Sequence, residues 1–371
     1  MTYRLEANAL DRLFKALGTK GYVIFGPTVR DSAVVYDRIE SPNDLPAGWA
    51  DQQTNGSYRL VKTDSPAYFD FTAPPQSWKR LLFPPSLHLF RSHRRNGTLE
   101  ILEEEHETEP MAFLGVRPCD LRALAILDSV YLNGGASDST YRQRREKTLI
   151  IAVNCTRAGG TCFCASMGTG PEAGAGFDLC LTELVSEHDH YFLVESGSAK
   201  GESCVSPLQA REATPQEQTS GREAIRTAAA AMGRSLQTQG LPELLAANLS
   251  HPRWDQIARR CLACANCTMV CPTCFCSTVE DSTDLSGAIA SRTRLWDSCF
   301  TAEFSYIHGG SLRPTIKSRY RQWMTHKLSS WVAQFGSFGC VGCGRCITWC
   351  PVGIDLTEEA RILRGQAAEH V

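Results

Sequence analysis

Residues 261–272 read Cys261-Leu-Ala-Cys264-Ala-Asn-Cys267-Thr-Met-Val-Cys271-Pro272. A second stretch, residues 340–351, repeats the pattern as Cys340-Val-Gly-Cys343-Gly-Arg-Cys346-Ile-Thr-Trp-Cys350-Pro351. Both follow the spacing Cys-x2-Cys-x2-Cys-x3-Cys-Pro, in which three thiolates wrap one face of a 4Fe-4S cubane and the fourth reaches the neighbouring cluster. These two stretches, called the first run and the second run below, therefore predict two 4Fe-4S clusters.

The crossed position of the fourth cysteine divides the eight ligands into two sets. The first cluster is expected to take Cys261, Cys264, Cys267 and Cys350, and the second Cys340, Cys343, Cys346 and Cys271. The small residues between the ligands let backbone N–H groups approach the cluster sulfurs; they are Ala263, Ala265, Gly342 and Gly344. Zinc is the alternative for either run, but tetrahedral zinc sites separate their Cys-x2-Cys pairs by a spacer.

The composition is otherwise that of an ordinary globular protein. The 371 residues include 17 cysteines and carry a formal net charge of −2, which gives no electrostatic case for binding nucleic acid. We find neither a secretory signal nor the roughly 18 uninterrupted apolar residues that a membrane span needs. Clustered cysteines in such a chain indicate a cytoplasmic metalloprotein rather than a disulfide framework.

Residues 1–205 predict a mixed α/β domain. We expect a helix at 6–17 and short strands at 22–25, 33–36, 58–61, 87–90 and 99–102. Buried strands are expected at 111–116 and 148–153, with a polar helix at 141–147 and, between the strands, a helix over 120–130 that has Asp120 as its N-cap. A strand, a helix and a strand in this order indicate a parallel pair with a crossover.

The chain changes character after residue 205. Residues 206–250 predict a helical linker with an exposed helix over 223–237, and beyond it strand signals nearly vanish. Helices are expected at 287–296, 317–326 and 327–335, so residues 251–371 resemble the α-helical ferredoxin domains of respiratory iron–sulfur subunits. The expected fold class is α+β, a mixed α/β N-terminal domain followed by an α-helical ferredoxin domain with two 4Fe-4S clusters.

A further group of cysteines lies in the N-terminal domain. Cys119 follows the first buried strand and Cys155 the second, with Cys162 and Cys164 close behind. Because parallel strands end at one edge of a sheet, these four thiols predict a third 4Fe-4S cluster there, walled by the loop 166–171. Zinc and a redox-neutral set of core and loop cysteines are the alternatives. Cys180, in a helix-like run over 179–184, is an alternative fourth ligand, and Cys204 is expected to be structural or exposed.

Other residues near the ligands are candidates for lesser roles. Cys274, Cys276 and Cys299 are expected to pack near the clusters, with direct ligation as the alternative. Arg117 and Arg345 neighbour expected ligands, where a positive charge favours the reduced cluster. The basic run over 313–327 is interpreted either as a partner-facing or cluster-stabilising surface or as the solvated face of a helix.

Several motifs together resemble the β subunit of cytoplasmic NiFe sulfhydrogenases, and the related A subunit of anaerobic sulfite reductase is similar. The motifs are Gly115-Val-Arg-Pro-Cys-Asp-Leu121, Thr161-Cys-Phe-Cys-Ala-Ser-Met-Gly-Thr-Gly-Pro171, Cys271-Pro-Thr-Cys-Phe-Cys276, Leu295-Trp-Asp-Ser-Cys299 and Cys340-Val-Gly-Cys-Gly-Arg-Cys346. The resemblance implies a subunit with several 4Fe-4S clusters that connects an NAD(P)(H) flavoprotein with the small and large subunits of a NiFe hydrogenase. In the related case the catalytic module is a siroheme sulfite reductase.

No catalytic residue is assigned to this chain. It has no Gly-x-Gly-x-x-Gly after a strand, and it lacks the terminal Cys-x-x-Cys pairs of a NiFe large subunit. The expected function is therefore a non-catalytic electron relay within an oxidoreductase complex. The alternative is an independent polysulfide or disulfide reductase that uses Cys274, Cys276 and Cys299.

Overall fold

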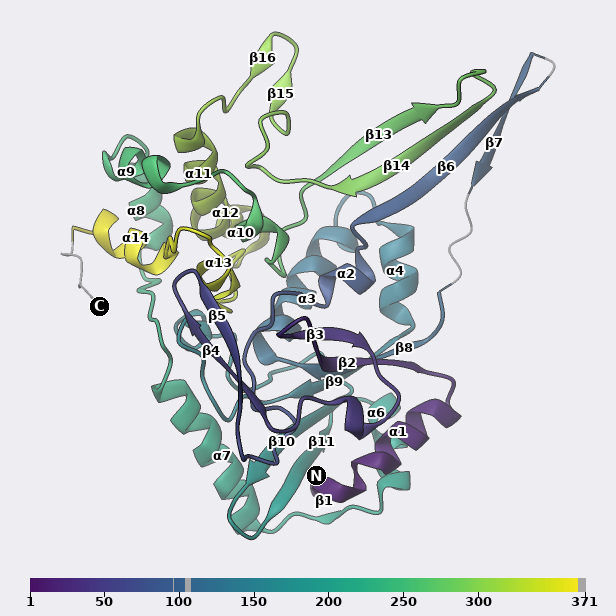
Figure 1. The fold of residues 1–371 in the computed structure, drawn as a ribbon, viewed down its shortest axis with the longest axis vertical. Helices are drawn as coiled ribbons and strands as arrows, with labels where there is room; N and C mark the ends of the chain where they lie inside the picture. The colour runs from purple at the N-terminus through teal and green to yellow at the C-terminus, as the bar shows by residue number, and fades with distance from the viewer. Residues whose placement is uncertain (96, 104–107, 366–371) are drawn as a thin grey trace.

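An eight-stranded sheet forms the centre of the N-terminal half of the protein (Figure 1). The structure, a computed structural model, describes residues 1–95, 97–103 and 108–365. In spatial order the strands are β12 (Arg211–Glu212), β1 (Thr2–Glu6), β11 (His190–Ser196), β10 (Leu179–Val185), β9 (Thr148–Val153), β8 (Met111–Val116), β2 (Val23–Arg30) and β3 (Ala33–Arg38). The four strands β2, β8, β9 and β10 are parallel, which confirms the predicted parallel pair.

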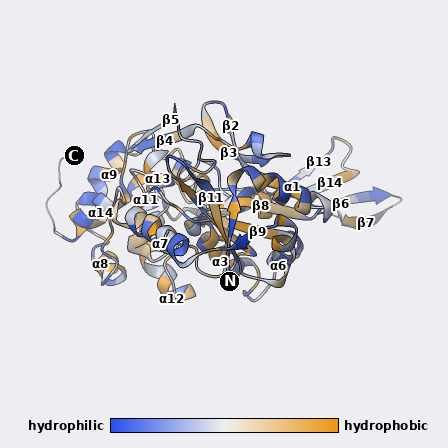
Figure 2. Cartoon of the chain, turned by 90° about the horizontal axis from the view of Figure 1, so that it is seen from below, coloured by the Kyte–Doolittle hydropathy of each residue, from blue (hydrophilic) through white to orange (hydrophobic). Residues whose placement is uncertain are grey.

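Both faces of this sheet are covered by helices. All residues of β8 and β9 are buried, and their side chains alternate between two cores. Leu114 packs with α1 (Leu10–Thr19) and α6 (Ala199–Val205), whereas Phe113 packs with α3 (Pro118–Tyr131) and α4 (Ser139–Glu146). Figure 2 shows these apolar strands between flanking helices. Continuous apolar strands are typical of a parallel sheet that is buried on both sides.

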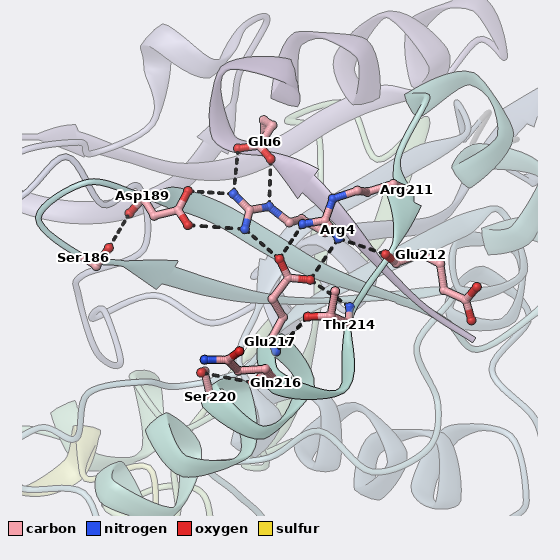
Figure 3. Close-up of polar contacts among 10 residues, drawn as sticks. All are labelled: Arg4, Glu6, Ser186, Asp189, Arg211, Glu212, Thr214, Gln216, Glu217 and Ser220. Atoms are coloured by element: carbon pink, nitrogen blue, oxygen red, sulfur yellow. Dashed lines mark hydrogen bonds and ion pairs between the residues drawn. The ribbon is translucent and has the colours of Figure 1, made fainter.

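An ion-pair network fixes the outer edge of the sheet (Figure 3). The guanidinium of Arg4 on β1 lies 2.7 Å from Glu6, 2.6 Å from Asp189 and 2.7 Å from Glu217. Glu217 also pairs with Arg211 of β12 and forms the capping box that begins α7 (Pro215–Ala230). The network therefore ties the first strand to the helix that leads toward the C-terminal half. This helix begins and ends earlier than the predicted helix over 223–237.

A four-stranded antiparallel arm, which Figure 1 shows projecting from the body, was not predicted. Its strands are β13 (Ser277–Thr283), β14 (Ile289–Trp296), β6 (Ser86–Arg95) and β7 (Thr98–Glu103). The predicted helix over 287–296 is wrong, because these residues pair with β13 on one side and with β6 on the other. Segments from before and after the expected linker thus share one sheet.

Helices build the remaining core around the first and second runs. They are α8 (Leu241–Ala247), α9 (Arg253–Arg260), α11 (Ile316–Thr325), the π-helical turn η4 (His326–Ser330), α12 (Trp331–Phe335) and α14 (Leu356–Leu363). The helices predicted at 317–326 and 327–335 are confirmed as one path that passes through η4. The large aromatic side chains Trp254, Tyr320 and Trp323 fill this core together with cysteines of both runs.

The shorter elements lie between these strands and helices along the chain. They are η1 (Ala7–Ala9), η2 (Pro42–Asp44), β4 (Trp49–Thr54), β5 (Ser57–Lys62), α2 (Lys79–Leu82), α5 (Cys164–Met167), η3 (Ser206–Leu208), α10 (Asn266–Met269), β15 (Tyr306–Ile307), β16 (Gly310–Ser311) and α13 (Arg345–Thr348). The β4–β5 hairpin packs on the second run, where Tyr58 stacks on Trp349 with ring centroids 5.1 Å apart. Gln53 accepts a 2.9 Å hydrogen bond from Thr348. Among the described helices, none has the length and apolar content to cross a membrane.

Candidate iron–sulfur centres

The first set of predicted ligands surrounds one cavity. Cys261, Cys264 and Cys267 line it with Cys350 and with Cys346 of the second set, and the cavity is partly open to solvent. Cys261 directly follows α9, and Cys267 lies on α10. Cys350 reaches the cavity from the second run, as the crossed arrangement predicts. The remaining wall contains Phe300, Tyr320 and Trp323. Of the four thiol-bearing residues, Cys264 is exposed.

The second set lies deeper. Cys271 of the first run lies near Cys340 and Cys343, and it also lies near Cys346. Burial raises the pKa of the Cys340 thiol to about 12, so without a metal this thiol stays protonated at neutral pH. Iron binding removes such protons, because the thiolate is the ligand. Cys350 of the second run thus lies with cysteines of the first run, and Cys271 of the first run lies with cysteines of the second.

Backbone N–H groups point at cysteine sulfurs of both runs, as expected from the small residues between the ligands. Ala263 N donates to Cys261 Sγ at 3.4 Å, Gly342 N to Cys340 Sγ at 3.5 Å, and Ile354 N to Cys350 Sγ at 3.3 Å. Positive φ angles make these turns possible, with Ala263 at 53° and Gly342 at 65°. Such hydrogen bonds stabilise negative charge on the sulfurs and therefore fit an iron–sulfur cluster.

Gly342 and Gly344 also press against the N-terminal cysteine loop. A Cβ atom on Gly342 would lie 2.7 Å from the backbone of Cys164, and one on Gly344 would clash with the carbonyl of Thr161. Phe163 N donates to Gly342 O at 2.8 Å. The loop that carries Cys162 and Cys164 is therefore packed directly on the second run.

Replacing Gly344 with alanine is expected to destabilise the folded protein by about 1–3 kcal/mol more than the same change at Gly336. Both glycines have a positive φ, 76° and 70°, so the backbone strain is matched. Only Gly344 has atoms close to the added methyl group, whereas Gly336 has none within 4 Å. Chemical denaturation of the two variants, purified without oxygen and followed by far-UV circular dichroism, measures this difference in unfolding free energy. Equal destabilisation would contradict the close packing of the two segments.

The four N-terminal cysteines come together at the predicted sheet edge. Cys119 lies on α3 just after β8, and Cys155 follows β9. Burial is the main reason that the pKa of the Cys164 thiol is raised, and the neighbouring Cys155 and Cys162 add to the shift. Cys164 and Cys343 lie close enough to Cys119 to raise its pKa as well, after burial and Asp120. Cys343 thus lies between the second set and the N-terminal group.

The loop 166–171 walls this group, as expected. A Cβ atom on Gly170 would lie 3.1 Å from Cys164 Sγ. Thr169 donates to Val341 O at 2.6 Å, and Cys155 N donates to Pro171 O at 3.0 Å. The loop therefore holds both the N-terminal cysteines and the second run.

A buried ion pair lies beside both the second set and the N-terminal group. Asp120 and Arg345 are 1% and 0% exposed, and the two Arg345–Asp120 N–O distances are 2.7 and 2.8 Å. Arg345 also donates to Pro74 O at 2.6 Å. Asp120 was predicted to cap α3, but the N-cap is Arg117 and the helix begins at Pro118. Arg117 is buried, donates to the carbonyls of Phe69 and Phe71, and lies beside Cys155.

Two buried lysines lie at the site. For Lys327 a cluster-stabilising role is one of the interpretations of the basic run, whereas nothing in the sequence indicates Lys79. Lys327, interpreted as part of a basic surface, is only 5% exposed and donates to Thr273 Oγ1 at 2.9 Å and Gly339 O at 3.2 Å. Lys79 is 3% exposed and donates to Cys274 O at 2.9 Å. Burial opposes the charge of Lys327, but Cys271 and further nearby thiols raise its pKa well above the ordinary value. A buried ammonium with only neutral hydrogen-bond partners fits an anionic cluster beside it.

The remaining cysteines divide into two kinds. Cys180 lies on strand β10, not on a helix, and packs in the core beneath α3. Cys204 is buried with α1, away from every other cysteine group. Cys274, Cys276 and Cys299 lie against the two paired sets. Within the described residues, no three Cys, His, Asp or Glu side chains are placed to share a single metal ion.

Comparison with known protein families shows which class of protein this chain belongs to. The family profile of the 4Fe-4S dicluster domain matches residues 260–354, which contain both runs. The C-terminal part is thus a dicluster domain that holds two 4Fe-4S clusters, and the chain is an iron–sulfur electron-transfer protein. It is 33% identical over 306 residues to sulfhydrogenase 2 subunit beta of Pyrococcus furiosus, covering 81% of this chain and 87% of the relative. The chain belongs to the sulfhydrogenase β-subunit family. No solved structure matches it.

Proposed function

We propose that this chain is the electron-relay subunit of a complex between an NAD(P)(H) flavoprotein and a NiFe hydrogenase with small and large subunits. The observation that carries the proposal is the contiguity of three four-cysteine groups, which meet at Cys271 and Cys343. The printed name of the relative, a β subunit of a sulfhydrogenase, supports a place in a larger complex. All 17 cysteines are free, which supports a cytoplasmic setting.

The proposed ligand sets are those that the cysteine motifs predict. Cys261, Cys264, Cys267 and Cys350 hold the first cluster; Cys340, Cys343, Cys346 and Cys271 hold the second; Cys119, Cys155, Cys162 and Cys164 hold a third 4Fe-4S cluster. Such clusters supply one-electron oxidation and reduction at potentials that the protein sets. Arg117 favours the reduced form of the third cluster, because it places a positive charge beside Cys155. Arg345 lies beside the second set with its charge balanced by Asp120, so its main role is to position that run.

The chain's own residues give the three sets different access to solvent. Cys119, Cys162 and Cys164 are buried, and so are Cys340 and Cys343, which keeps water from these sets. Cys264 is exposed, and Leu262 beside it is an exposed apolar residue. We therefore propose that a redox partner approaches the first set, since electron transfer between proteins needs a short distance between their centres.

The spectra of cysteine-to-serine variants are expected to group by the cluster that the cysteine binds, and not by the run in which it lies. Because Cys271 lies with the second set, the electron paramagnetic resonance (EPR) spectrum of reduced Cys271→Ser should match that of Cys340→Ser. Likewise, the spectrum of Cys350→Ser should match that of Cys261→Ser. Spectra that pair Cys271→Ser with Cys261→Ser would contradict the crossed assignment.

Anaerobic purification of the tagged full-length chain tests the partners. NiFe small and large subunits and a flavoprotein are expected among the co-purifying proteins that mass spectrometry identifies. A siroheme subunit would instead favour the sulfite reductase relay. A lone chain with its own polysulfide or disulfide reductase activity would contradict the relay proposal.

A further inference from the structure

Three helices wall the opening of the first set. Helix α9 ends at the residue before Cys261, Tyr320 and Trp323 of α11 line the cavity, and α14 begins two residues after Ile354 of its wall. Helix α9 packs against both α11 and α14, and Figure 1 shows the three together on one side of the molecule. The outward side chains of these helices therefore set the charge of the surface around the opening.

These three helices carry a surplus of positive charge. They contain seven basic and three acidic residues, in a chain whose formal net charge is −2. Adjoining residues bring three charges of each sign and leave the surplus unchanged; they are Arg234, Asp297, Glu303, Arg313, Asp355 and Arg364. Four more positive than negative charges thus lie around the first set.

The carboxylates of these helices, Asp255, Glu358 and Glu359, are all paired within the same helices. Asp255 lies 2.8 Å from Lys317, and Glu359 lies 2.5 Å from Arg253 and 2.6 Å from Arg260. Arg253 also lies 3.9 Å from Glu358. The helices therefore present no unpaired carboxylate that would repel an acidic partner.

Four arginines remain without such a partner. Within residues 1–95, 97–103 and 108–365, no ion pair involves Arg259, Arg319, Arg321 or Arg361. Arg259 is exposed two residues before Cys261, and Arg319 donates to the carbonyl of Phe300, in the cavity wall, at 2.7 Å. A helix face that only keeps the protein soluble needs no such surplus, because interspersed charges of both signs serve that purpose.

The opening itself offers only a small apolar contact. Leu262 is 62% exposed and lies beside the exposed Cys264, whereas Phe300, Tyr320 and Trp323 behind them are buried. Permanent subunit interfaces are large and have an apolar core, whereas the interfaces of transient redox complexes are small. A basic rim attracts an acidic surface and repels another basic one. The surface therefore fits a transient partner with acidic side chains.

We propose that the opening of the first set docks a small electron-carrier protein whose own redox centre is surrounded by acidic side chains. The proposal rests on the relay function and adds a mobile carrier to the partners that are bound in the complex. The unpaired arginines steer the carrier so that its centre meets Leu262 and Cys264. One electron then leaves the reduced carrier and enters the first cluster, and no covalent bond forms or breaks.

Stopped-flow measurement of electron transfer from a reduced, small acidic ferredoxin to the full-length chain, purified without oxygen, tests the docking. The second-order rate constant of the wild type is expected to fall about tenfold or more between roughly 20 and 500 mM NaCl, because salt screens the steering charges. Arg259→Glu should lower the rate constant about threefold to tenfold at the lower salt concentration. Arg259→Glu/Arg361→Glu should lower it further.

Lys15→Glu is the matched control for this test. It changes the net charge by the same amount, but Lys15 is exposed on α1, which Figure 1 shows on the opposite side of the molecule from α9. Its rate constant should equal that of the wild type. Reduced methyl viologen, a small cation, is the control donor, and its rate should not fall in Arg259→Glu.

Three results would overturn the proposal. The first is an Arg259→Glu rate constant equal to that of the wild type at low salt. The second is a changed potential of the first cluster in Arg259→Glu, which would show that this arginine serves the cluster and not a partner. The third is a wild-type chain that takes electrons from methyl viologen but not from the ferredoxin, which would leave the relay intact. A chain that takes electrons from neither donor would contradict the relay as well.

Discussion

Replacing Asp120 with alanine is expected to destabilise the folded protein by about 3–5 kcal/mol, because it leaves the buried Arg345 guanidinium without its anion. Both carboxylate oxygens of Asp120 accept hydrogen bonds from Arg345, and neither side chain reaches solvent. Denaturant titration of the anaerobic protein, followed by far-UV circular dichroism, measures the change.

Two further variants isolate the cause. The double variant Asp120→Leu/Arg345→Met removes both charges and is expected to recover much of the lost stability. The exposed pair of Arg292 and Asp281 offers a control, and Asp281→Ala should leave the denaturation midpoint unchanged. If Asp120→Ala were as stable as the wild type, the ion pair would not hold the two halves together.

Replacing Lys327 with methionine is expected to lower the reduction potential of the second cluster on the order of 100 mV. Reduction adds a negative charge, so removing the nearby buried ammonium makes the reduced state less favourable. Lys327 is hydrogen-bonded to Thr273, and its charge lies near Cys271 and Cys340. A potentiometric titration monitored by EPR measures the shift.

Lys317 provides the matched control for this charge. It is ten residues earlier on the same helical path, but its ammonium pairs with Asp255 at the surface, 2.8 Å away. Solvent screens that charge, so Lys317→Met should leave all potentials in place. A Lys327→Met protein with wild-type potentials would show that this lysine only fills space.

The sequence indicates candidate metal ligands because their signal is local. Three cysteines at two-residue spacing constrain the backbone by themselves, and the buried strands 111–116 and 148–153 fix where Cys119 and Cys155 emerge. The arm could not be predicted in the same way. Strand β14 pairs with β6, which lies about two hundred residues earlier in the chain, and no local pattern encodes that partner.

The residues around the ligands were harder to predict for a related reason. Asp120 looks like a helix cap when only its neighbours are considered, but its partner Arg345 is 225 residues away. Lys327 belongs to a basic run for which the sequence leaves both a solvated face and a cluster-stabilising role open, and its place in the π-helical turn η4 buries it. Burial of a charge depends on tertiary packing, so the local sequence decides neither role.

Anaerobic coulometric titration of the isolated full-length chain tests the electron-transfer assignment most directly. We expect the chain to take up about three electrons, one for each 4Fe-4S cluster of the proposed sets. These electrons should be returned on reoxidation without any substrate. A chain that contains zinc, or iron that accepts no electrons, would contradict the account.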